Sequence, residues 1–151
     1  MSNSELRDLY QQVIIDHSKN PRNFCICEGA NHIKEGYNPL CGDKIKLYIK
    51  EKNGIIEDVC FQGIGCAISM SSASLMSEAI KGKTIAEAMK LFDEFQKLLT
   101  VKDYKEDAKL LGKLEVLAGV AEYPMRIKCA TLPWHTLKAA LNDEEKEVTT
   151  E

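Results

Sequence analysis

The sequence predicts an α+β domain in which helices pack on one face of a small three-stranded antiparallel sheet. Two patterns carry this prediction. Apolar and polar residues alternate between residues 43 and 64, which is typical of half-buried strands, and apolar residues recur at helical spacing after Cys66. The chain has 151 residues, about the length of one domain, and shows no internal repeat. We therefore expect a single domain, with its core in 4–142 and a polar, frayed tail at 143–151.

Local signals set the expected boundaries. Asn20-Pro21 ends the first helix, and Asn53-Gly54 is a strong hairpin turn. Thr84 and Glu87 have the spacing of a capping box, and Pro133 is expected to divide the last helical stretch into two pieces. In chain order we expect a helix at 4–19, a loop at 20–30, a short strand near 31–37, strands at 43–50 and 55–61, helices at 67–80 and 85–99, a charged connector at 100–108, a helix at 109–120, and helical pieces on either side of Pro133.

The composition excludes several classes of function. Lys and Arg total 20 against 23 Asp and Glu, and the net charge of −3 gives no basic excess for nucleic-acid binding. No apolar run approaches the roughly 20 residues of a membrane helix, and the polar N-terminus has no signal-peptide core. We therefore expect a cytoplasmic protein. Since disulfides are rare there, its six cysteines are available for metal binding, catalysis or packing.

The stretch NPLCGDKIKLYIK, residues 38–50, places a thiol and a carboxylate at the mouth of a strand. Side chains alternate across a strand, so Cys41 and Asp43 share the face of Ile45 and Leu47, which is the core face. A carboxylate there is costly unless it is paired or binds a metal. The alternative is that Asp43 lies outside the sheet and only organises a turn rich in Asn, Pro and Gly. The strand pattern alone leaves both interpretations open.

Two further cysteines lie at the ends of elements. Cys66 follows two glycines at the start of a helix, where the helix dipole favours a thiolate, and Cys129 has Arg126 and Lys128 close in sequence. A buried cysteine in a tight turn and a helix-end cysteine beside surface cations are the plainer interpretations. No CxxC pair is present, so spacing cannot establish a site. If gathered, three thiolates and the Asp43 carboxylate would suit tetrahedral Zn²⁺ or an iron–sulfur cluster.

The other candidates are interpreted more simply. Cys25 and Cys27 form a CxC in a loop, and we expect exposed or half-buried thiols without a role. Cys60 lies in a strand and is expected in the core. The three histidines are interpreted as structural or packed side chains: His17, His32 and His135.

Three motifs resemble those of the NifU N-terminal (IscU-like) family, and most closely its SufU branch. They are NPLCGDKIKL, GIGCAISMSSASLMSEAIKGKT and RIKCATLPWHTLKAAL, and the resemblance extends from LYQQVIIDHSKNPRN to LKAAL. It implies the SufE/NifU-like fold, a compact α+β domain with helices on one face of a three-stranded antiparallel sheet. It also implies that four residues gather at one end of the molecule: Cys41, Asp43, Cys66 and Cys129.

Three departures from the scaffold branch favour the SufU branch. Scaffold members have a histidine immediately before the third cysteine, where this chain has Lys128. They also carry a chaperone-binding motif that EYPMRIKC lacks. SufU-type members have an insertion of about 20 residues between the second and third cysteines, and the segment around 100–119 matches it.

The resemblance implies a zinc-dependent sulfur acceptor in iron–sulfur cluster assembly, which as an enzyme would be a sulfurtransferase. Zn²⁺ would be held by the four residues named above. Cys41 would take the outer sulfur of a persulfide from a SufS-type, pyridoxal-phosphate-dependent cysteine desulfurase, Arg126 would have an accessory role, and downstream assembly proteins would receive the sulfur. The alternatives are a scaffold that builds a [2Fe–2S] cluster on the same ligands and an interaction module whose zinc is only structural.

Overall fold

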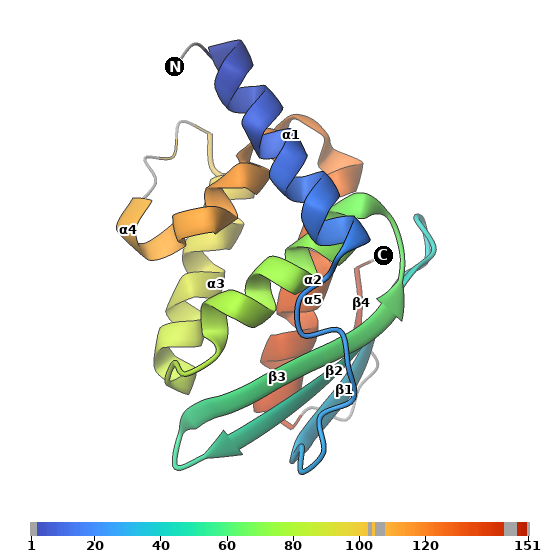
Figure 1. The fold of residues 1–151 in the computed structure, drawn as a ribbon, viewed down its shortest axis with the longest axis vertical. Coiled ribbons are helices and arrows are strands. Elements are labelled where there is room, and N and C mark those ends of the chain that lie inside the picture. The colour runs from blue at the N-terminus through green and yellow to red at the C-terminus, as the bar shows by residue number, and fades with distance from the viewer. Residues whose placement is uncertain (1–2, 103, 105–107, 144–147, 151) are drawn as a thin grey trace.

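The chain folds into two layers, with helices on one face of a sheet, as the sequence predicts (Figure 1). The computed structural model describes residues 3–102, 104, 108–143 and 148–150. The helices are α1 (Asn3–Lys19), α2 (Ala67–Ile80), α3 (Ile85–Thr100), α4 (Ala108–Leu111), the 3₁₀ helix η1 (Gly112–Glu122) and α5 (Pro124–Leu141). The strands are β1 (His32–Asn38), β2 (Asp43–Lys52), β3 (Ile55–Ile64) and β4 (Val148–Thr149).

The sheet has four strands and is mixed, which corrects the prediction of three antiparallel strands. Its order is β3-β2-β1-β4. The strand β2 pairs antiparallel with both β1 and β3, and β4 pairs parallel with β1. The tail is therefore not simply frayed, because Val148 and Thr149 pair with Gly36 and Tyr37. Residues 144–147 and 151 of the tail lie outside the described residues. A two-residue strand has too little pattern to be recognised in a polar sequence.

The core lies between the sheet and the helices. Ile45, Leu47 and Ile49 of β2 are at most 1% exposed, which confirms the strand phase. On the helical side, the Trp134 ring stacks on Phe92 and Phe95, with centroids 6.0 and 5.2 Å away. The apolar period of each element therefore selects the face that it buries.

The helix α5 approaches β1 closely. A Cβ on Gly36 would collide with the Thr136 hydroxyl and lie 3.1 Å from Leu132, so only glycine permits this contact. The consequence is that Cys129 of α5 lies beside Asn38, the last residue of β1.

The prediction that Pro133 divides the last helix is wrong, because α5 is continuous from Pro124 to Leu141. Pro133 removes the N–H that would bond to the carbonyl of Cys129, at a cost of about 3 kcal/mol in an isolated helix. Burial of Ala130, Leu132 and Trp134 on either side offsets this cost.

The remaining boundaries agree closely with expectation. The Thr84–Glu87 capping box is present at the start of α3. The predicted helix at 109–120 is a short α-helix continued by a 3₁₀ helix, α4 and η1, whereas residues 103 and 105–107 of the connector lie outside the described residues. None of the described helices is both long enough and apolar enough to cross a membrane.

Candidate metal centre

Asp43 begins β2 and points into the protein. It pairs with Asn38 across the β1–β2 hairpin and is 2% exposed. Its Oδ1 accepts hydrogen bonds from the backbone N–H of Cys66 at 2.9 Å and from Ser69 Oγ at 3.1 Å. Its Oδ2 accepts one from Asn38 Nδ2 at 3.1 Å. Asp43 is therefore a strand residue on the core face, and the interpretation as a mere turn residue is wrong.

Cys41 lies in the turn between β1 and β2, two residues before Asp43. The turn brings its backbone N–H within 3.3 Å of the Asn38 carbonyl, and Gly42 adopts a φ of +69° that favours glycine. The Cys41 side chain is half-buried, so it is the donor at the mouth of the group.

Cys129 approaches the same point from α5 and is completely buried. Its sulfur accepts a hydrogen bond from Asn38 Nδ2 at 3.3 Å. Burial raises the pKa of the Cys129 thiol, and contacts with Cys41 and Asp43 raise it further. The donor atoms of Cys41, Asp43 and Cys129 all lie within 4.8 Å of one another. A bound cation would relieve the cost of deprotonating this buried thiol.

Cys66 is only partly brought into this group. It is the N-cap residue of α2, and its backbone N–H is bonded to Asp43. Its thiol, however, faces Ser69 Oγ at 3.8 Å and is not among the three donors that lie within 4.8 Å. The structure thus assembles three of the four predicted donors and places the backbone of the fourth against them.

Gly65 makes this arrangement possible. A Cβ there would lie 2.5 Å from Asp43 Oδ1 and 2.5 Å from Ser69 Oγ. Gly65 therefore permits the close approach of the β3–α2 turn to a buried carboxylate.

Arg126 extends from α5 over the exposed side of the group. Its Nη1 is 3.8 Å from the Cys41 sulfur. Hydrogen bonding to Cys129, followed by the charges of Cys66, Cys129 and Cys41, raises the pKa of Arg126 above its usual value. A guanidinium here favours negative charge on the neighbouring sulfurs.

Sequence reasoning missed Asn38, which joins the donors. Its amide bridges the Asp43 carboxylate and the Cys129 sulfur from a fully buried position. Its Oδ1 is buried without a hydrogen-bond partner within the part of the chain that the structure describes. The only available signal was its place opposite Asp43 in the hairpin. Thiols, a fixed carboxylate and an unpartnered buried oxygen together fit a site for a thiophilic cation.

The histidines contribute nothing to this group. His17 bonds to Ser74 Oγ at 2.8 Å, His32 to the Ala140 carbonyl at 2.9 Å, and His135 packs edge-on against Phe92. The prediction for Cys25 and Cys27 is only partly right, because Cys25 is exposed but Cys27 is 7% exposed. Cys27 is buried because it packs against Cys60 on the outer face of the sheet.

Comparison with known proteins gives consistent results. Residues 9–130 match the model of the NifU-like N-terminal domain. The chain is 46% identical to the zinc-dependent sulfurtransferase SufU of Bacillus subtilis over 95% of its own length and 96% of that protein. It is 43% identical to the iron–sulfur cluster assembly scaffold protein IscU of Streptococcus pyogenes, over 93% of the chain and 87% of that protein.

The fold comparison agrees. A crystal structure of a putative iron–sulfur cluster assembly scaffold protein for the SUF system, from Fervidobacterium islandicum, superposes with a TM-score of 0.82 at 38% identity. The superposition covers 89% of this chain and 98% of that one. This chain and the proteins it resembles thus form one class of protein, small α+β domains, and in this chain the domain carries a group of thiol and carboxylate donors. The chain belongs to the NifU-like N-terminal domain family, as its motifs predicted.

Proposed function

We propose that this protein is a zinc-dependent sulfur acceptor of iron–sulfur cluster assembly, with Cys41 as the acceptor. One observation carries this assignment to Cys41. Cys129 and Asp43 are at most 2% exposed, whereas Cys41 is half-buried and lies beside the exposed Arg126. Of the three donors that lie within 4.8 Å of one another, Cys41 is therefore the one that an external sulfur donor meets first. Cys66 is also half-buried, but its thiol faces Ser69 Oγ, whereas Cys41 has Arg126 beside it. The resemblance to a zinc-dependent sulfurtransferase over almost the whole chain supports the sulfur-acceptor function.

The metal would be held by Cys41, Asp43, Cys66 and Cys129, three thiolates and one carboxylate. When bound, Zn²⁺ keeps these thiols deprotonated without redox chemistry of its own. Asn38 and Ser69 fix the Asp43 carboxylate, and Asn38 also orients Cys129. Ordered neighbours of this kind hold ligands in position.

The transfer is a thiol–disulfide exchange. The Cys41 thiolate attacks the outer sulfur of a cysteine persulfide on a pyridoxal-phosphate-dependent desulfurase of the SufS type. A bond forms between Cys41 Sγ and that sulfur, the sulfur–sulfur bond of the donor breaks, and the donor cysteine leaves as thiolate. Arg126, 3.8 Å from Cys41 Sγ, stabilises the negative charge on the acceptor.

A desulfurase assay tests the proposal. We expect the wild-type protein to accelerate sulfur release by a SufS-type desulfurase and Cys41→Ser to abolish the acceleration. Cys25→Ser is the matched control, because Cys25 is an exposed thiol outside the group. Arg126→Ala should slow transfer without changing the zinc content. Acceleration by Cys41→Ser equal to that of the wild type would remove the assignment.

The 43% identity to an assembly scaffold supports a second candidate, in which the same donors hold a [2Fe–2S] cluster. Anaerobic reconstitution with iron and sulfide separates the two functions. A scaffold gains visible absorption and transfers its cluster to an apo-ferredoxin. A sulfur acceptor retains zinc through the treatment and gains no such absorption.

A further inference from the structure

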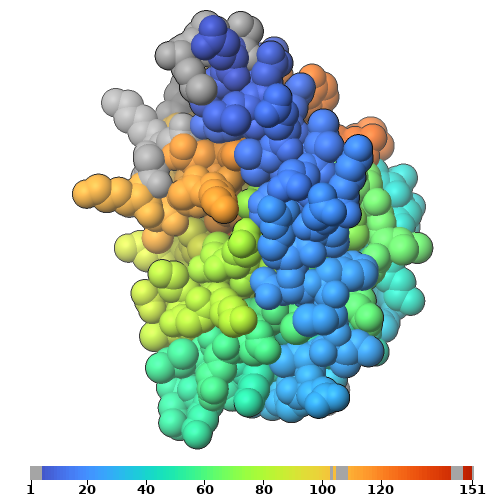
Figure 2. All heavy atoms as spheres, in the orientation of Figure 1, coloured from blue at the N-terminus to red at the C-terminus, as the bar shows by residue number. Residues whose placement is uncertain are grey.

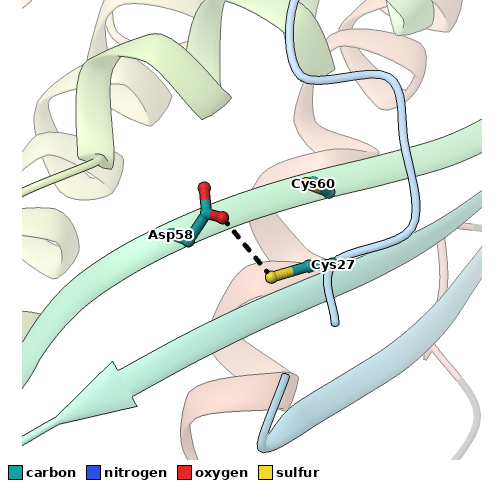
Figure 3. A group of neighbouring side chains, drawn as sticks. All are labelled: Cys27, Asp58 and Cys60. Carbon is teal, nitrogen blue, oxygen red and sulfur yellow. Dashed lines mark hydrogen bonds between the residues drawn. The ribbon is translucent and has the colours of Figure 1, made fainter. Parts of the chain in front are cut away.

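A second group of thiols lies on the outer face of the sheet, which the helices do not cover. Asp58 and Cys60 are alternate residues of β3, so their side chains share a face, and Tyr48 of β2 pairs with Cys60. Cys60 is 4% exposed although no helix covers it. Figure 3 shows Asp58 and Cys60 on one strand, with Cys27 reaching them from a separate loop.

The segment after α1 covers this face. It runs along the outer edge of β3, the edge that does not pair with β2. There the Cys25 N–H donates to the Phe61 carbonyl at 3.1 Å, and the Phe61 N–H donates to the Asn23 carbonyl at 3.0 Å. In Figure 2 the N-terminal segment, in blue, crosses the front of the molecule from top to bottom. This path places Cys27 over β3 and leaves Cys25 at the solvent side. Burial, followed by the neighbouring Cys25, raises the pKa of the Cys60 thiol.

The donor atoms have the spacing of a coordination site. Those of Cys27, Asp58 and Cys60 lie within 4.8 Å of one another, and Cys27 Sγ is 3.6 Å from Asp58 Oδ2. For a tetrahedral zinc with bonds of about 2.3 Å to sulfur and about 2.0 Å to oxygen, adjacent sulfur and oxygen ligands are roughly 3.5 Å apart. The 3.6 Å between Cys27 Sγ and Asp58 Oδ2 is close to this separation of neighbouring ligands.

Neighbouring groups orient the Asp58 carboxylate toward the thiols. Its Oδ1 accepts the backbone N–H of Val59 at 2.9 Å and pairs with Lys81 Nζ at 3.3 Å. Its Oδ2 is directed toward Cys27. One carboxylate oxygen is thus fixed by the protein and the other is presented to the thiols. Lys81 would also partly balance the negative charge of the thiolates that a bound cation requires.

Packing alone accounts for this group less well. Cys27, Cys60 and Tyr48 form a small buried cluster, and free cysteines often serve as small apolar side chains. In the metal-free state the Cys27 thiol donates a hydrogen bond to Asp58 Oδ2 at 3.6 Å. Packing and this single bond do not account for Cys60, whose sulfur lies within 4.8 Å of both donor atoms.

We propose that Cys27, Asp58 and Cys60 form a second site for a thiophilic divalent cation of the Zn²⁺ type. Cys25, which is not among the three donors within 4.8 Å, would move in to complete the donor set when the ion binds. The exposed Cys25 gives the ion a path from solvent. An ion bound there ties the segment around residues 23–30 to β3. The site uses none of the residues of the first centre, so its test is independent of the proposed sulfur transfer.

Zinc stoichiometry tests the proposal directly. The full-length protein, reduced and freed of metal, is titrated with Zn²⁺ in competition with a chromophoric chelator. We expect two equivalents for the wild type. We expect one for Cys41→Ser/Cys66→Ser, which removes the two half-buried thiols of the first centre, and one for Cys27→Ser/Cys60→Ser.

Two further measurements separate metal binding from folding. Cys27→Ala/Cys60→Val keeps an apolar cluster without sulfur and should fold, as circular dichroism would show, while binding one equivalent. In Cys41→Ser/Cys66→Ser, Co²⁺ should produce a thiolate charge-transfer absorption, and Zn²⁺ should slow the alkylation of Cys25, the exposed thiol of the second site. One equivalent in the wild type that disappears entirely in Cys41→Ser/Cys66→Ser overturns the proposal. So do two equivalents in Cys27→Ala/Cys60→Val, or equal alkylation with and without zinc.

Discussion

Replacing Gly65 by alanine is expected to displace the buried Asp43 carboxylate. The new Cβ would lie 2.5 Å from both Asp43 Oδ1 and Ser69 Oγ, well inside van der Waals contact. Asp43 Oδ1 would then lose the hydrogen bonds from Cys66 N–H, at 2.9 Å, and Ser69 Oγ, at 3.1 Å. The metal centre would lose the fixed position of its oxygen donor.

The size of the effect follows from these bonds. A hydrogen bond to a charged group contributes about 1.5–3 kcal/mol. The Ser69 hydroxyl retains an alternative acceptor in the Cys66 carbonyl at 3.0 Å, so its loss is partial. We expect Gly65→Ala to lower the free energy of unfolding by about 2–4 kcal/mol. For a domain of this size that lowers Tm on the order of 10 °C.

Urea denaturation of the metal-free protein, followed by circular dichroism, measures this change. Gly119→Ala is the matched control, because a Cβ there meets no atom within 4 Å. Its expected effect is close to zero or slightly stabilising. A Gly65→Ala protein as stable as Gly119→Ala, with unchanged zinc affinity, would refute the close approach described for Asp43.

Two further predictions concern stability away from the centre. Thr84→Ala breaks the capping box of α3 and should lower the free energy of unfolding by about 1 kcal/mol with no change in zinc content; an unchanged unfolding curve would contradict it. For His32, burial lowers the pKa, but hydrogen bonds to Glu51 and Asp143 outweigh it and raise the pKa above the 6.5 of an unfolded chain. The contribution of protonated His32 to the stability of the folded protein is therefore complete below about pH 6.5, and it is lost as pH rises through the pKa of His32 in the folded state. Urea curves should accordingly show that His32→Gln costs more stability at about pH 6 than at about pH 8, and an equal cost at both would contradict the ion pairs.

Local sequence patterns predicted most of the fold because they report burial directly. The alternation around Ile45 and Leu47 identified β2 and its buried face, and the Thr84–Glu87 spacing located the start of α3. The continuity of α5 through Pro133 was not predictable, because tertiary burial outweighs a local cost. The same holds for β4, whose two residues pair only because β1 offers an open edge.

The candidate site was predictable in part. The strand phase put Asp43 on the core face only if the strand already began there, and it left the turn interpretation open. The family motifs singled out Asp43 together with the three cysteines. The bridging role of Asn38 and the direction of the Cys66 thiol, toward Ser69, depend on side-chain geometry that spacing does not encode. The burial of Cys27 likewise depends on a loop that folds back over the sheet.

Mass spectrometry of the protein after reaction tests the central claim most directly. The zinc-loaded protein is incubated with a SufS-type cysteine desulfurase, pyridoxal phosphate and cysteine, then alkylated and digested. We expect one added sulfur on the peptide that contains Cys41, and none there in Cys41→Ser. Added sulfur on any other cysteine, with Cys41 unmodified, would contradict it.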